Sequence, residues 1–446
     1  MLYQRTETHC LRPNDPLYKW AVEECKHHAR LYNRANYIKR QAFTGKLENL
    51  DEEYKDKVRE GKFISQNDII RVMTKMKDEL YYSCTKRNSA QQTIIRLEAD
   101  WKSWRRALAE YKKNPSKFNG KPRVVGYYKE NELAPVYFST ADAKLQKDGT
   151  IYLQQKRKNQ KEIKLPFHTN LTKIQQVHLV PKQGRIDVEL IYNIDIQPLN
   201  LDKTKAIGID LGVNNLAAIT SNVEDISILV NGRPLKSYNQ FYNKRLAEIK
   251  SKLSKDELKT SKRLERLHFK REMKIKDYLH KASRRIVDLM LQYNIGKCFI
   301  GHNKWWKDEA NMSKKNNQNF IYIPHSKFID ILRYKFEQVG GEVIELNESH
   351  TSKCSFLDNE EICHHDKYIG KRKRRGMFQA TNNRQLNADI NASLNIIKKG
   401  FGCSFNPSKA IFNPIKIDIE KKRLIGNIDR RGINGNASVG LRTDTK

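Results

Sequence analysis

Three acidic residues lie where predicted strands or helices begin or end. Asp210 follows the apolar run 206–209, Glu348 comes just after a predicted strand at 342–346, and Asp389 lies in the first turn of a predicted helix. Carboxylates at strand ends gather at one edge of an α/β sheet. Three of them would repel one another unless cations lay between them. Two divalent ions about 3.5–4 Å apart would balance these charges and would also polarise a phosphodiester.

The chemistry of these acids favours Mg²⁺, or Mn²⁺, because hard cations prefer oxygen ligands. Each acid alone has a plainer interpretation, since an Asp near a helix N-terminus is an ordinary cap and an acid at a strand end is common. The order of all three along the chain is more informative than any one of them. We therefore treat Asp210, Glu348 and Asp389 together as the candidate catalytic and metal-binding residues.

The elements around these acids must bring them together. In chain order the sequence predicts strands at 206–210 and 216–220, a Lys-rich helical stretch at 237–293, a strand at 297–300, a helix at 325–339, a strand at 342–346 and a helix at 386–398. A strand–helix–strand unit implies a parallel pair joined by a right-handed crossover. This order matches an RNase H-like nuclease domain, which we place at 203–400.

The first half of the chain shows a different pattern of predicted secondary structure. Residues 15–132 are predicted to be mainly helical, while the opening segment 1–14 and residues 133–202 show the alternation of antiparallel strands. One helical stripe consists of Ala90, Ile94, Leu97, Trp101, Trp104, Leu108 and Tyr111. Its opposite face carries Arg105 and Arg106, which could bind phosphate or could simply be a solvated basic face. The helical region would then be an insertion into a small β-barrel.

The composition indicates a polyanionic partner. The 446 residues include 85 Lys and Arg against 51 Asp and Glu, a formal net charge of +34, and such self-repulsion favours nucleic acid as the partner. Ribosome-like structural binding and binding to a membrane surface are the plainer alternatives. No apolar run approaches the ~20 residues of a membrane helix, and the N-terminus lacks the apolar core of a signal peptide. Seven cysteines without a Cys-x-x-Cys pair make no disulfide framework. We expect a cytoplasmic, nucleoid-associated protein, nuclear if eukaryotic, with no membrane partner.

Four segments carry a family resemblance. They are Gly208-Ile209-Asp210-Leu211-Gly212, Ile300-Gly301-His302-Asn303-Lys304-Trp305-Trp306-Lys307, Glu348-Ser349-His350-Thr351-Ser352-Lys353 and Asn387-Ala388-Asp389-Ile390-Asn391-Ala392. With them, residues 203–400 resemble the RuvC nuclease domain of transposon-encoded TnpB proteins, relatives of Fanzor and of type V CRISPR effectors. The resemblance implies a multidomain α+β protein with a helical recognition lobe, an antiparallel β-barrel wedge domain and an RNase H-like (RuvC) α/β nuclease domain.

The chain departs from the family pattern at the middle acid. In that pattern a glutamate ends the strand that lies here at 297–300, but this place holds Gly301-His302-Asn303. A subset of the family uses a relocated glutamate, and Glu348 fits that role. Neighbouring strands lie ~4.8 Å apart, so a Glu at the end of the next strand can reach the same ions. Glu309, in the loop after the strand, is the competing candidate.

The second departure concerns zinc. The family places two Cys-x-x-Cys pairs before the last aspartate, whereas the insert at 353–385 holds Cys354, Cys363, His364 and His365 without such pairs. That spacing is poor for a tetrahedral site, so we expect no zinc. The insert carries a basic cluster at 371–375, which could be a solvated loop or a clamp for a DNA strand. The expected nucleic-acid contacts are Lys304, Lys307, Arg372, Arg374, Arg375, Arg384, Arg105 and Arg106, and the basic tail 401–446 is expected to be flexible.

The resemblance implies a transposon-associated, RNA-guided DNA endonuclease that hydrolyses phosphodiester bonds with two metal ions. Its partners would be a guide RNA and double-stranded target DNA with a short adjacent motif. The missing acid at Gly301 keeps a second hypothesis open, a nuclease-inactive RNA-guided repressor on the same scaffold. A structural RNA-binding protein and a guide-free resolvase or transposase are further alternatives. The net charge alone would fit a structural RNA-binding protein, and an RNase H-like core alone does not exclude a resolvase or transposase.

Overall fold

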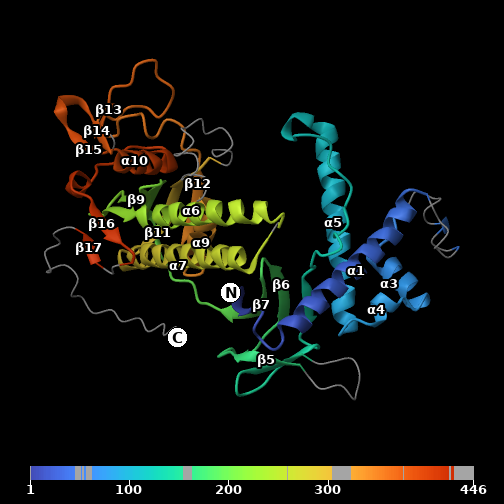
Figure 1. Cartoon of the computed structure of the whole chain (residues 1–446). Coiled ribbons are helices and arrows are strands. Elements are labelled where there is room, and N and C mark those ends of the chain that lie inside the picture. Colours follow the sequence, from blue (N-terminus) through green and yellow to red (C-terminus); the bar gives the residue numbers. More distant parts are fainter. Residues whose placement is uncertain are drawn as a thin grey trace. The chain divides into compact units, whose positions relative to one another are not determined.

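The computed structural model describes residues 2–45, 52, 55–56, 63–153, 163–258, 260–303, 323–374, 376–420 and 423–425. The chain divides into two compact units, residues 1–195 and 196–446. Each unit mixes helices with sheets, so the predicted α+β character is confirmed (Figure 1). Within the described residues, no helix is long and apolar enough to cross a membrane.

The first unit is built on two antiparallel sheets. One has the order β1-β7-β6-β2 and the other β3-β4-β5. The strands are β1 (Leu2–Leu11), β2 (Val136–Ser139), β3 (Ala143–Leu145), β4 (Thr150–Leu153), β5 (Ile163–His168), β6 (Gln176–Lys182) and β7 (Arg185–Asp195). β1 pairs along its whole length with β7, from Leu2 opposite Asp195 to Leu11 opposite Ile186, which confirms that the opening strand joins the later ones. The described strands do not close into a ring, so the predicted barrel is not confirmed.

The helices of this unit lie in sequence between β1 and β2, as an insertion. They are α1 (Tyr18–Phe43), α3 (Gln66–Lys75), α4 (Glu79–Tyr82) and α5 (Arg87–Lys113), followed by a 3₁₀ turn at Pro115–Lys117. The predicted stripe on α5 is buried at Ala90, Ile94, Leu97 and Trp101, and becomes half-buried from Trp104 onward. The apolar periodicity therefore identified the face of α5 that packs against α1.

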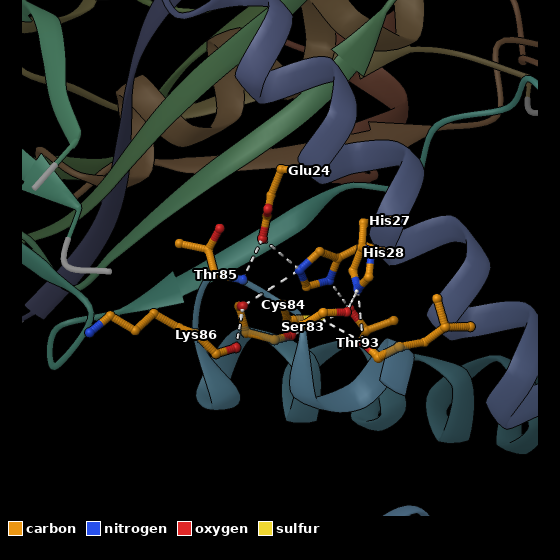
Figure 2. A network of polar contacts seen from close by, with 10 residues as sticks. Glu24, His27, His28, Ser83, Cys84, Thr85, Lys86 and Thr93 are labelled. Atoms are coloured by element: carbon orange, nitrogen blue, oxygen red, sulfur yellow. Dashed lines mark hydrogen bonds and ion pairs between the residues drawn. The ribbon is translucent and has the colours of Figure 1, made fainter. Parts of the chain in front are cut away.

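A buried polar network ties α1 to the segment that leads into α5 (Figure 2). His28 Nδ1 lies 2.6 Å from Thr93 Oγ1, its Nε2 lies 3.3 Å from Glu24 Oε1, and Thr85 N donates to the same Glu24 oxygen at 3.1 Å. His27 Nε2 lies 2.8 Å from the carbonyl oxygen of Leu80. Both ring nitrogens of His28 and Nε2 of His27 thus have partners in the protein, and the network fixes how α1 lies against α4 and α5.

The second unit centres on a seven-stranded sheet of order β12-β11-β8-β9-β10-β16-β17. Its strands are β8 (Asp202–Leu211), β9 (Asn215–Ser221), β10 (Ser227–Asn231), β11 (Ile295–Gly301), β12 (Glu342–Leu346), β16 (Ile415–Asp418) and β17 (Arg423–Ile425). β9 runs antiparallel to both β8 and β10, while β8, β11 and β12 are mutually parallel. The predicted hairpin after Asp210 and the predicted parallel pair before Glu348 are both present.

The helices of the second unit are α6 (Arg233–Lys255), α7 (Lys262–Gln292), α9 (His325–Glu337) and α10 (Ala388–Phe401). The Lys-rich stretch that we predicted as one helical region forms two helices, α6 and α7, which lie side by side (Figure 1). The insert forms a small sheet of β13 (Lys371–Arg374), β14 (Met377–Gln379) and β15 (Gln385–Asn387), with a 3₁₀ turn at Thr381–Asn383.

The expectation of a flexible tail is wrong for part of the segment after residue 400. A 3₁₀ turn at Lys409–Phe412 leads into β16, which pairs in parallel with β10, Ile228 lying opposite Ile415. The alternation of Ile415 and Ile417 with polar residues is the signal of a strand with one buried face. The high charge around it masked that signal.

Alternation along β8 assigns its two faces. Ile207, Ile209 and Leu211 belong to the core formed with α7 and α9. The residues between them point to the other face, where Ala206 shares a cluster with Ile396 of α10 and Gly208 lies against Ser393 and Ile397. Asp210 continues this second series. The sheet is therefore covered by α7 and α9 on one face and by α10 on the face that carries Asp210.

Candidate active site

Asp210 lies near the end of β8, on the face that α10 covers. Its pKa is raised well above the usual range, first by burial and then by the negative charges of Asp389 and Glu348, while the Arg372 guanidinium acts in the opposite direction. No hydrogen bond to the Asp210 carboxylate is found among the described residues. The two other predicted acids are thus close enough for their charges to act on Asp210, although they come from distant parts of the sequence.

Close contact between α10 and β8 sets the place of Asp389. Ser393 donates a hydrogen bond to the carbonyl oxygen of Gly208 at 2.8 Å and shares another of 2.8 Å with Thr220. A Cβ on Gly208 would collide with the Ser393 carbonyl oxygen and would lie 2.7 Å from Ile397 Cγ1. Only glycine permits this approach, so the helix that carries Asp389 packs directly on the strand that carries Asp210.

Asp389 is the second residue of α10. The Asn387 side chain caps the helix by accepting from the backbone N–H groups of Asp389 (2.9 Å) and Ile390 (3.3 Å). The Asp389 carboxylate itself accepts from Asn215 Nδ2 at 2.7 Å and lies 3.6 Å from an Arg372 nitrogen. The cap is therefore made by Asn387, and the carboxylate of Asp389 is turned toward neighbouring elements rather than toward its own helix end.

Glu348 lies two residues beyond the end of β12, on the same face. Ile344 and Leu346 pack with Ile396 of α10, and continued alternation places Glu348 on this side. A Cβ built on Gly301 would lie 3.2 Å from Glu348 Cβ, so Glu348 occupies the space beside the strand end where the family pattern has its acid. Burial raises the pKa of Glu348, and the neighbouring His302 acts in the opposite direction.

Two groups near Glu348 were missed by sequence reasoning. The Asn303 side chain accepts a hydrogen bond from Glu348 N at 3.2 Å. His302 Nδ1 lies 2.9 Å from Glu345 Oε2, and Arg333 forms an ion pair with the same carboxylate. Burial raises the pKa of Glu345, but the bonds from Arg333 and His302 outweigh this effect and leave it below its usual value. His302 and Asn303 could have been identified from their position in the sequence, because they directly follow the strand end that lacks an acid.

The predicted nucleic-acid contacts of the second unit fall into three sets. Arg372 and Arg374 lie on the fully exposed strand β13, Arg372 reaching Asp389. Arg384 is occupied within the insert, where it donates to Asp358 at 2.8 Å and to the Leu357 carbonyl oxygen at 3.2 Å. Lys304, Lys307 and Arg375, together with the competing acid Glu309, lie outside the described residues.

The two arginines predicted on α5 differ from each other. Arg106 is exposed. Arg105 donates to the buried Glu98 at 3.0 Å, and its guanidinium lies over the Phe63 ring at 4.9 Å from the centroid. Glu98 also forms a buried ion pair with Lys39. Arg105 is therefore part of the internal packing of the helical region, while Arg106 presents its charge to solvent.

The next question is whether the candidate metal ligands form a binding site. Among the described residues, no three Cys, His, Asp or Glu side chains form a ready-made metal site. Cys354 is buried, and its thiol donates to the carbonyl oxygen of Cys363 at 3.7 Å, while Cys363 Sγ lies 3.3 Å from His365 Nε2. The three acids do present the right donors for a hard cation, since they are carboxylates whose charges disfavour one another. The donor set fits magnesium or manganese by its chemistry.

Comparisons with known proteins show which families and proteins the chain is similar to. A family model described as a probable transposase, OrfB_IS605, matches residues 189–307, and a Cas12f1-like TNB domain model matches residues 325–396. The chain is 23% identical over 240 residues to the TnpB-like protein ORF457 of Acidianus two-tailed virus, covering 49% of this chain and 46% of that protein. It is 28% identical over 120 residues to the TnpB-like protein MJ0751 of Methanocaldococcus jannaschii, covering 27% and 43%. The chain thus spans about half the length of the curated relatives it matches.

Two solved structures are similar over most of the chain. One is a Cas12f1–sgRNA–target DNA complex, with 17% identity, a TM-score of 0.32 and coverage of 88% of this chain and 98% of that one. The other is the mini-RNA-guided endonuclease CRISPR-Cas_phi3, with 12% identity, a TM-score of 0.45 and coverage of 91% and 94%. The two family models cover the motifs around Asp210 and Asp389, and both curated proteins are described as TnpB-like, so the chain is similar to TnpB proteins.

Proposed function

We propose that this protein is an RNA-guided DNA endonuclease that hydrolyses phosphodiester bonds with two divalent metal ions. The observation that carries the proposal is the convergence of Asp210, Glu348 and Asp389 on one face of a sheet, inside a chain with a net charge of +34. A purely structural RNA-binding protein would use the positive charge but would gain nothing from three carboxylates that repel one another. The relation to TnpB proteins supports the same conclusion.

The proposed fold assignment rests on the sheet of the second unit. The order β10-β9-β8-β11-β12, with β9 alone antiparallel, supports an RNase H-like (RuvC) nuclease core at 203–400 with an insert at 353–385. For the first unit we propose a wedge formed by 1–14 and 133–202 and a recognition lobe at 15–132. Residues 401–446 would follow this core in the sequence, with β16 and β17 extending its sheet beside β10.

Asp210, Glu348 and Asp389 would hold the metal ions. Bound there, the ions would lower the pKa of an attacking water and stabilise the leaving oxygen. The protein's own contribution is to fix the acids on α10, β8 and the segment after β12, and to keep Asn215 bonded to Asp389. Arg372, which now balances the charge of Asp389, would be free to contact a phosphate once cations take over that role.

Sequence selectivity would come from base pairing between a guide RNA and target DNA, with a short adjacent motif read by the protein. Among the described residues, Arg106, Arg372, Arg374 and Arg384 are exposed candidates for phosphate contacts, and Arg106 and Arg374 form no ion pair there. We also retain Arg105, Lys304, Lys307 and Arg375 as proposed contacts. A phosphate would have to compete with Asp358 for Arg384, and with Glu98 for Arg105.

The experiment is cleavage of a target plasmid by the protein purified with its RNA, in Mg²⁺ or Mn²⁺. Sequencing the copurified RNA defines the target. Asp210→Asn should abolish cleavage and leave guided binding intact, while Asp202→Asn, at the other end of the same strand, is the matched control. Cleavage by Asp210→Asn at the wild-type rate would refute the assignment of the site.

The inactive repressor is favoured by a single observation, the glycine at position 301. The structure weakens that argument, because Glu348 lies beside Gly301. Guided binding by the wild type without cleavage in either metal would nevertheless establish the repressor. Glu348→Gln tests the relocated acid separately, with Glu309→Gln as its comparison.

A further inference from the structure

The backbone after Glu348 is not held by the sheet. β12 ends at Leu346, and residues 349–356 form turns in which His350 has a positive φ of 68°. Within this segment the carbonyl oxygen of Glu348 accepts from Thr351, at 3.1 Å from its backbone N–H and at 2.8 Å from its hydroxyl. These contacts shape the turn, but alone they do not fix it relative to the other acids.

Two asparagines of α10 make that connection. Asn395 Nδ2 donates to the carbonyl oxygens of Thr351 and Cys354, each at 2.8 Å. Asn391 Nδ2 donates to the same Cys354 oxygen at 2.8 Å, and its Oδ1 accepts from Phe356 N at 3.1 Å. Being four residues apart, the two side chains share one face of the helix. Together they bind the turn after Glu348 to the helix that begins beside Asp389.

The burial of this contact is unusual for such polar groups. Asn391 and Asn395 are both 0% exposed, and Asn395 Oδ1 has no hydrogen-bond partner among the described residues. An unsatisfied buried acceptor is unfavourable, so packing alone would be better served by an apolar side chain. Asn395 donates two hydrogen bonds, which neither Leu nor Asp at this position could do.

We propose that Asn391 and Asn395 are positioning residues that hold Glu348 at the distance from Asp389 which metal binding requires. The inference rests on the proposed function, in which both acids are metal ligands. α10 then sets all three acids at once, because Ser393, between the two asparagines, binds the helix to β8 beside Asp210. Neither asparagine touches a metal or the substrate.

The test compares variants by their response to Mn²⁺. Asn395→Asp keeps the shape of the side chain but removes both donors. Thr351→Val removes only the hydroxyl that bonds the Glu348 carbonyl oxygen. Ile397→Val, a buried change on α10 toward β8, is the control for lost packing. Two readouts are the Mn²⁺ concentration at the midpoint of thermal stabilisation, which needs no activity, and the rate of plasmid cleavage.

We expect Asn395→Asp to raise the Mn²⁺ midpoint about tenfold or more, as loss of an outer-shell partner does, and Thr351→Val to raise it less. Ile397→Val should lower the melting temperature with an unchanged midpoint. If Asn395→Asp does not fold, Asn391→Asp, which removes the donor bond to the Cys354 carbonyl oxygen, decides in its place, since an unchanged midpoint there overturns the proposal. If the wild type cleaves but the asparagine variants keep the wild-type Mn²⁺ midpoint, the positioning role is refuted while the proposed function stands. A wild type with neither stabilisation by Mn²⁺ nor cleavage refutes this inference together with the proposed metal site.

Discussion

Gly301 offers a sharp test of the relocated acid. A Cβ at this position would lie 3.2 Å from Glu348 Cβ and 2.6 Å from Ile396 Cδ1. The Ile396 methyl is the end of a flexible side chain and can move, but Glu348 Cβ is held by the backbone around it. Gly301→Ala should therefore cost about 1–3 kcal/mol of unfolding free energy, the range for overpacking a closed site. It should also displace Glu348 and reduce cleavage.

The same substitution in a Glu348→Gly background should cost less, because the Cβ that it meets is gone. We expect a coupling of about 0.5–3 kcal/mol between the two positions, measured by urea unfolding of the four proteins of the cycle. A Gly301→Glu/Glu348→Gly double variant, which returns the acid to the strand end, should cleave faster than Glu348→Gly alone. If Gly301→Ala changes neither stability nor cleavage, or if the two substitutions are additive, the two residues do not share one space and the reasoning fails.

Three further outcomes follow from the charges. Without divalent cations, Asp210→Asn should stabilise the protein at pH 7, because the raised pKa of Asp210 makes the folded state lose stability as pH rises from the usual Asp range through that pKa. The gain should vanish below about pH 4, and urea unfolding in EDTA at several pH values measures both effects. Glu98→Ala should cost about 3–5 kcal/mol by leaving Lys39 buried without its carboxylate, and Lys39→Met should recover most of this loss in thermal unfolding. Arg374→Gln should weaken DNA binding equally for all sequences and lower the salt slope by about 1, which a titration at several salt concentrations would show.

Much of the second unit could be predicted because its signals are local. The apolar run ending at Asp210, the strand at Glu342–Leu346 and the helix start at Asn387 each depend on a few neighbouring residues. The parallel pairing of β11 with β12 followed from connection rules rather than from side chains. The division of the basic stretch into α6 and α7 was missed, since Lys and Arg favour helix throughout and hide the turn between them.

The contacts that fix the acids could not be predicted, because they join residues far apart in the sequence. Asn215, at the start of β9, bonds Asp389 of α10, and Asn303 bonds the backbone of Glu348 from the neighbouring strand end. An asparagine in a helix or loop carries no periodic signal that distinguishes such a bond from exposure to water. The bond from Arg105 to Glu98 was missed for a different reason, since the two residues are only seven apart on α5 and the charge of Arg105 did not reveal that its partner is a buried acid.

The position of Glu348 also bears on whether the site is active. Gly301 and Leu346 are opposite each other in the parallel register of β11 and β12. Moving an acid from the end of β11 to just past the end of β12 shifts it by about one strand spacing, ~4.8 Å, which is less than the reach of a glutamate side chain across the same edge. A Cβ at 301 would approach Glu348 Cβ to 3.2 Å, so a glycine at this position leaves room for Glu348. If Glu348 is the relocated acid that we propose, a glycine at 301 would be what it requires, and its presence would not argue for an inactive site.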